Sequence, residues 1–284
     1  MIQGFSYSFY EQSAKAILEK LQADQRPQPR IGIILGSGLD HLGKRCENPL
    51  EISYREIPNF FPTTNSMHAG KMIFGTISGV PVVLLSGRIH HYEGYSFEEL
   101  AQPVRVLKLL GVETLIVTNA AGAVNPDFKV GQIMMMTDQI KLFGGSPLQG
   151  PNVEEFGPRF PDMTDLFTPS LREKAWEVAE SIGLDHFCEG VYFYLPGPQF
   201  ETPAEIKAVG ILGGDAVGMS TVNETITARH CGMSLLGFSL LTNLATGLSP
   251  HPRSDQEVVE TAHQAASYFE EFILALLPAL AAKK

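Results

Sequence analysis

The feature that most constrains the fold of this chain is a series of short apolar runs, most of them bounded by Gly, Pro or Asn. Several of these runs lack polar alternation, as strands buried on both faces do. Segments of helical periodicity lie between them, so we predict one α/β domain over residues 1–284, with a central sheet flanked by helices. The predicted strands are Ile31–Leu35, Val80–Leu85, Thr114–Thr118, Gln132–Thr137, Gly190–Tyr194, Ala216–Met219 and Ser234–Leu241.

The helical segments are recognised by apolar residues at spacings of three and four and by their starting residues. The helix predicted over residues 221–231 opens with Thr221 and Glu224 at capping-box spacing. The helix predicted over residues 254–277 has Ser254 or Asp255 as an N-cap candidate. Residues 138–168 show neither period and are rich in Gly, Pro and Asn, as functional or disordered loops are. The predicted helices span residues 170–182, 203–212, 221–231 and 254–277.

Composition excludes several classes of protein. Hydrophobic residues make up 44% and charged residues 18% of the 284 residues, which is typical of a globular chain with an ample core. The formal charge of −10 argues against a nucleic-acid or anionic-membrane surface. Any phosphate that this protein binds must therefore be attracted by a local pocket.

Cysteine usage and the two ends of the chain favour a cytoplasmic protein. Cys46, Cys188 and Cys231 are odd in number, far apart and form no CxxC pair, which argues for a reducing compartment. Residues 1–10 lack the pattern of a secretory signal, and the apolar run 272–282 is too short to span a bilayer. No spacing of His and carboxylate residues indicates a metal site.

The loops that follow the predicted strands contain the polar groups. Gly36-Ser37-Gly38 lets backbone amides approach an anion, although such a turn is common and His41 stands where a dinucleotide fingerprint needs Gly. In the loop after Leu85, alternation brings Arg88, His90 and Tyr92 to one side, where Arg and His can hold phosphate. Glu93 is placed to hold the His90 ring; the alternative is a solvated polar loop.

Three further loops offer groups for a flat ligand. Residues 118–123 are small enough for a ligand to meet bare backbone, or for close helix–strand packing. Phe200 offers a ring for stacking and Glu201 an acceptor for a purine N–H, although an acid also suits a helix start before Pro203. Asn243 can cap a segment or contact a base edge. Because all these loops follow apolar strands, we predict that they meet in one ligand crevice.

At these loops the sequence resembles the trimeric purine nucleoside phosphorylases, in order from about residue 10 to residue 275. The resemblance implies a mixed β-sheet flanked by helices and a homotrimer in which Phe160 closes a neighbour's sugar pocket. The matching segments are Gly36-Ser37-Gly38-Leu39, Gly87-Arg88-Ile89-His90-His91-Tyr92-Glu93-Gly94-Tyr95, Thr118-Asn119-Ala120-Ala121-Gly122, Gly197-Pro198-Gln199-Phe200-Glu201-Thr202, Asp215-Ala216-Val217-Gly218-Met219-Ser220-Thr221 and Thr242-Asn243.

The resemblance also assigns roles to residues of these motifs. Phosphate, a co-substrate that makes any other cofactor unnecessary, is placed against Ser37, His68, Arg88, His90, the Ala120 amide and Ser220. The nucleoside is placed against Tyr92, Phe160, Phe200, Glu201, Val217, Met219, Thr242 and Asn243. The catalytic residues implied are His90, Glu201 and Asn243.

The activity implied is phosphorolysis of 6-oxopurine nucleosides such as inosine and guanosine. Two alternatives stay open: a methylthioadenosine phosphorylase of the same fold, which has Asp in place of Asn243, and a non-catalytic nucleoside-binding protein. The resemblance fails at one place. Family members carry a His toward the ribose 5′-hydroxyl where this chain has Asp255, and His251 lies four residues earlier. Asp255 or His251 can contact the 5′-hydroxyl, or Asp255 can act only as a helix cap.

Overall fold

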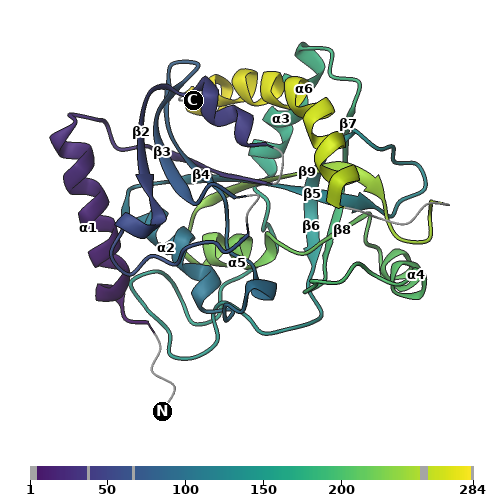
Figure 1. The fold of residues 1–284 in the computed structure, drawn as a ribbon, viewed down its shortest axis with the longest axis horizontal. Coiled ribbons are helices and arrows are strands. Elements are labelled where there is room, and N and C mark those ends of the chain that lie inside the picture. Colours follow the sequence, from purple (N-terminus) through teal and green to yellow (C-terminus); the bar gives the residue numbers. More distant parts are fainter. Residues whose placement is uncertain (1–4, 37–38, 66–67, 250–254, 283–284) are drawn as a thin grey trace.

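The computed structural model describes residues 5–36, 39–65, 68–249 and 255–282 (Figure 1). Its strands form one nine-stranded sheet in the order β2-β3-β4-β1-β5-β8-β7-β6-β9. The strands are β1 (Ile31–Leu35), β2 (Glu47–Ser53), β3 (Lys71–Ile77), β4 (Val80–Ser86), β5 (Thr114–Ala123), β6 (Ile133–Ile140), β7 (Phe187–Tyr194), β8 (Ala216–Gly218) and β9 (Ser234–Leu244). The helices are α1 (Tyr7–Ala23), α2 (Gln102–Leu109), α3 (Pro169–Ser181), α4 (Pro203–Ile211), α5 (Val222–His230) and α6 (Asp255–Ala281).

Strand β5 is central to the sheet, because it pairs with three other strands. It pairs in parallel with β1 on one side and with β9 on the other, and its last residues also pair antiparallel with β8. Since β8, β7, β6 and β9 pair in turn, these strands and β5 form a closed ring, from which β1, β4, β3 and β2 extend. The sheet is therefore mixed, as expected from the resemblance.

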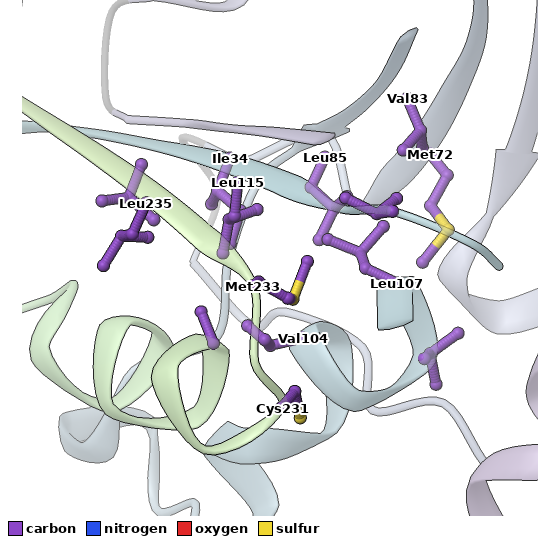
Figure 2. Packing of buried hydrophobic residues seen from close by; sticks show 14 of the residues in the cluster. Ile34, Met72, Val83, Leu85, Val104, Leu107, Leu115, Cys231, Met233 and Leu235 are labelled. Atoms are coloured by element: carbon purple, nitrogen blue, oxygen red, sulfur yellow. The ribbon is translucent and has the colours of Figure 1, made fainter. Parts of the chain in front are cut away.

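Both faces of the central strands are buried, which explains their unbroken apolar sequences. On one face Ile34 and Leu115 pack toward helices α1, α2 and α5, and Figure 2 shows them opposite Val104 of α2. On the other face Ile33 and Ile116 pack with residues of α3 and α6. Alternate residues of one strand thus enter two separate cores.

The seven predicted strands are confirmed, with changes in length. The third is wrong at its end, because residues 119–123 continue strand β5 and do not form a loop. Residues 138–140, predicted to lie in a long irregular segment, complete β6. Four of these strands and α-helices were not predicted: α1, α2, β2 and β3.

No helix within the described ranges is both long enough and apolar enough to cross a bilayer. The longest, α6, instead places Ala265, Phe269 and Phe272 in the core between this helix and the sheet.

Candidate active site

The ends of three parallel strands bring the polar loops together. In the register of the sheet Leu35 lies opposite Ser86, and Ile34 lies opposite Val117. The chain after β1 therefore runs beside Thr118 and Asn119 of β5, and the Gly36 amide donates to Thr118 Oγ1 at 2.9 Å. A Cβ on Gly36 would lie 2.5 Å from the Asn119 Cα, so only glycine fits there.

A crevice of about 790 Å³, part of it open to solvent, lies at these strand ends. Most of the residues expected to bind phosphate or nucleoside line it, so strands and loops far apart in sequence meet at one site. The expected residues that line the crevice are His68, Arg88, His90, Tyr92, Ala120, Phe200, Glu201, Val217, Met219, Ser220, Thr242 and Asn243.

Three stacked rings form one side of the crevice. The His90 ring lies between His68, at a centroid distance of 5.3 Å, and Tyr92, at 4.6 Å. Glu93 holds the His90 ring, with 2.9 Å between the carboxylate Oε1 and His90 Nδ1. The predicted contact between Glu93 and His90 is therefore present. It directs the other ring nitrogen, Nε2, away from Glu93.

Burial makes both histidines weak bases. It lowers the pKa of His90, against the effect of the Glu93 hydrogen bond, and it lowers the pKa of His68 to about 3 with help from His90 and Arg88. Neither ring nitrogen of His68 has a hydrogen-bond partner among the residues described. A buried ring with two unused nitrogens beside the crevice is available to a ligand.

Arg88 is fixed by a residue that the sequence analysis assigned to another role. Its Nε and Nη2 donate to the two carboxylate oxygens of Glu224, at 2.9 and 3.0 Å, and Nη1 donates to Thr118 O at 2.8 Å. The predicted capping box of Thr221 and Glu224 is wrong, because Thr221 makes no side-chain cap and Glu224 binds Arg88. Since 136 residues separate Arg88 and Glu224, no local pattern pointed to the pair.

Apolar side chains and a carboxylate line another part of the crevice. Phe200, which is 39% exposed, and Val217, which is buried in β8, both line the crevice. Helix α4 has its own capping box, in which the Thr202 amide donates to Glu205 Oε2 at 2.7 Å. The capping role is therefore filled by Glu205, and Glu201 lines the crevice, where burial raises its pKa.

Strand pairing places Asn243 near Val217. Gly122 of β5 lies opposite Val217 of β8 and opposite Asn243 of β9. The Thr242 hydroxyl donates to Asn243 Oδ1 at 3.0 Å, and Asn243 Nδ2 donates to Leu244 O at 3.0 Å. These two bonds set the orientation of the amide, and within the described part of the chain they leave its second N–H for a ligand.

The remaining expected residues lie elsewhere. Phe160 is 87% exposed and does not line the crevice of its own chain. Ser37 and His251 lie outside the described residues. Asp255 is the first residue of α6, and the structure describes only its backbone. Among the described residues, no group of three or more His, Cys, Asp or Glu side chains could hold a metal ion.

The site defines a class of protein with one crevice, lined both by cationic and hydroxyl groups and by an aromatic ring with a carboxylate and an amide. Residues 30–278 match the phosphorylase superfamily. A purine nucleoside phosphorylase 1 from Geobacillus stearothermophilus is 48% identical over 94% of this chain and 96% of its own length. The Bos taurus purine nucleoside phosphorylase is 45% identical over 99% of this chain and 98% of its own length.

Solved structures agree with the sequence relatives. The Schistosoma mansoni purine nucleoside phosphorylase in complex with inosine has a TM-score of 0.91 and 38% identity, with 99% of this chain and 100% of that chain covered. The chain therefore belongs to the phosphorylase superfamily and, within it, to the purine nucleoside phosphorylases.

Proposed function

We propose that this chain catalyses the phosphorolysis of 6-oxopurine ribo- and deoxyribonucleosides, such as inosine and guanosine. The products are the free purine base and the pentose 1-phosphate. One observation carries the proposal: groups suited to hold an anion and groups suited to a base edge line a single crevice. The names of the relatives support it.

The phosphate would lie among Arg88, His90, His68, Ser220 and the Ala120 amide. All of these groups line the crevice. Because the bond to Glu93 is made through Nδ1, a neutral His90 that carries its proton there presents Nε2 as an acceptor. His90 can then accept the P–OH hydrogen bond of a phosphate dianion, whose other oxygens face donors. Ser37 is expected to complete this group.

The purine would lie against Phe200 and Val217, with the ribose between Tyr92 and Met219. Cleavage of the bond from C1′ to N9 leaves a cation-like sugar and a purine anion. The phosphate dianion stabilises the sugar, and the free N–H of Asn243 donates to N7 as negative charge develops. Donors aimed at developing charge accelerate the step because they bind the transition state more tightly than the substrate.

Glu201 would select the base. A carboxylate accepts from N1–H, which hypoxanthine and guanine carry and adenine lacks. A site that is built on this bond rejects adenosine strongly, since a buried charge is then left without a partner. The raised pKa of Glu201 reflects the desolvation that makes such a loss expensive.

The test is the ultraviolet change on release of hypoxanthine from inosine, measured with and without inorganic phosphate. We expect cleavage only with phosphate; equal rates without it would indicate a hydrolase, and no cleavage would favour a binding protein. Adenosine is compared by kcat/KM and not by binding, because the Schistosoma mansoni relative has also been crystallised with adenosine. Equal kcat/KM for adenosine and inosine would contradict the role of Glu201.

We further propose that the chain acts as a homotrimer in the cytoplasm, where it recovers purine bases. The Phe160 ring is 87% exposed, so a neighbouring subunit that covered it would remove its apolar surface from water, which favours assembly. The Arg159 side chain donates to Leu148 O and Gly150 O, both at 2.9 Å, and so ties down the segment before Phe160. The three free thiols suit a reducing compartment.

A further inference from the structure

The ion pair between Arg88 and Glu224 limits which N–H groups of Arg88 can bind phosphate. Glu224 lies in the first turn of α5, is 6% exposed, and receives both Nε and Nη2 of Arg88. Nη1 donates to Thr118 O at 2.8 Å and to Ser220 Oγ at 3.2 Å. Among the described residues, partners are thus present for all but one of the five N–H groups of the guanidinium.

The use of the Nε edge by Glu224 determines which edge remains for a ligand. An arginine binds an oxyanion through two neighbouring N–H groups, either at the Nε edge or at the Nη1/Nη2 edge. The first edge is occupied by a protein carboxylate. The second edge contains the one N–H without a partner, on Nη2, and its Nη1 donates to Thr118 O and to the Ser220 hydroxyl. Both Arg88 and Ser220 line the crevice.

The turn before α5 holds Ser220 and Glu224 in place around Arg88. Thr221 has φ 73° and ψ −50°, and the Val222 amide donates to Ser220 O at 2.8 Å, which makes a γ-turn. A β-branched residue rarely adopts this conformation. The Thr221 hydroxyl accepts from Asn119 Nδ2 at 2.9 Å, so the unusual turn is tied to strand β5.

We propose that Glu224 is a positioning residue for phosphate: it holds Arg88 by the Nε edge so that the remaining N–H of Nη2 faces the anion beside Ser220. Glu224 itself does not touch phosphate. This inference rests on the proposed phosphorolysis, since it assigns phosphate to the end of the crevice that Arg88 lines. This role requires a carboxylate, because its two acceptor oxygens match the two parallel N–H groups of Arg88, on Nε and Nη2.

Two substitutions separate geometry from charge. Glu224→Asp keeps the charge but is one methylene too short to meet Nε and Nη2 together, whereas Glu224→Gln keeps the shape and loses the charge and one acceptor. If Glu224 positions Arg88, both variants should lower kcat/KM for phosphate about 10- to 100-fold. The KM for inosine should stay within about twofold, since the base end is untouched.

Thr227→Val is the matched control. Thr227 is fully buried on the same helix, and its hydroxyl donates to Asn223 O at 2.7 Å without contacting Arg88. It should lose stability and keep the wild-type kinetics for phosphate. In an Arg88→Ala background, Glu224→Gln should cause no further loss, because Glu224 acts through Arg88.

Three outcomes would overturn the inference. Wild-type kcat/KM for phosphate in both variants would mean that the pair is only structural. Tighter phosphate binding by Glu224→Gln with unchanged turnover would mean that Glu224 acts by charge and not by geometry. A full additional loss in the Arg88→Ala background would mean that it acts elsewhere. If the wild-type enzyme did not need phosphate, the proposed function would fail before any variant was made.

Discussion

The Glu93→Gln substitution tests how one carboxylate holds two loops together at the phosphate end of the crevice. Glu93 Oε1 accepts from the His90 amide at 2.8 Å and from its ring at 2.9 Å. Oε2 accepts from the Thr64 amide and hydroxyl, at 2.5 and 2.7 Å, and from the Asn65 amide at 3.2 Å. A glutamine amide has a single oxygen, so in either orientation its NH₂ faces backbone N–H groups that have lost their acceptor.

The loss of folding free energy in Glu93→Gln can be estimated from the lowered pKa of the Glu93 carboxylate. Burial alone would raise the pKa of Glu93, but hydrogen bonds from His90 and Thr64 outweigh it and lower the pKa from 4.5 to about 2. The side chain is 3% exposed, so solvent screens these bonds little. At about 1.36 kcal/mol for each pKa unit, the ionised form contributes about 3 kcal/mol to folding. Glu93→Gln should lose about this amount at pH 7.

The dependence on pH has a definite sign. Because the pKa of Glu93 is lower in the folded than in the unfolded chain, its contribution is complete above about pH 4.5 and is lost as the pH falls toward 2. The difference between wild type and variant should therefore be equal at about pH 7 and pH 5 and should shrink toward pH 3.

The assay is urea unfolding at matched protein concentration, followed by the fluorescence of Trp176, the only tryptophan. Glu56→Gln is the control, because its ion pair with Lys20 is on the surface, with side chains 59% and 42% exposed. We expect it to change stability by less than about 1 kcal/mol. A loss for Glu93→Gln below about 1 kcal/mol at pH 7, or a difference as large at pH 3 as at pH 7, would refute the reasoning.

Three further predictions concern the substrate. Asn243→Asp should raise kcat/KM for adenosine relative to inosine, because a carboxylate accepts from the exocyclic amine of adenine; an unchanged ratio contradicts the base assignment. Phe160→Ala should raise the inosine KM about 10-fold without changing the mass found by light scattering, whereas a fully active wild-type monomer would exclude a shared site. Asp255→Ala should narrow the kcat/KM gap between inosine and 5′-deoxyinosine by about 1.5–3 kcal/mol, with a smaller effect for His251→Ala. If both variants keep the wild-type ratio, neither residue contacts the 5′-hydroxyl.

Two of the four elements that were not predicted, β2 and α2, have weak or misleading patterns. Strand β2 lies at the edge of the sheet and buries only Ile52 well, so it has no apolar run. Helix α2 is buried throughout its first turns, and Gln102 and Arg105 interrupt its apolar residues although both are in the core. Helix α1 does carry a helical stripe, with Tyr10, Ala14, Ile17 and Leu21 buried on one side, and could have been predicted.

The sequence by itself determined the α/β architecture and the position of the site at the strand ends. Strand β1, and β4 as far as Leu85, contain no polar side chain because both faces are buried, and this is a local property of the chain. The loop after Leu85 likewise carries Arg88, His90 and Glu93 within a few residues, so their cooperation was visible in the sequence.

Only the tertiary structure decided which distant residues meet. The partner of Arg88 is 136 residues away, and a capping-box spacing gave Glu224 the wrong role. Asn243 comes beside Val217 because Gly122 pairs with strands on both sides, which depends on the closed ring of the sheet. The reason is physical: spacing along the chain sets secondary structure, whereas hydrogen bonds and ion pairs form wherever packing brings buried groups together.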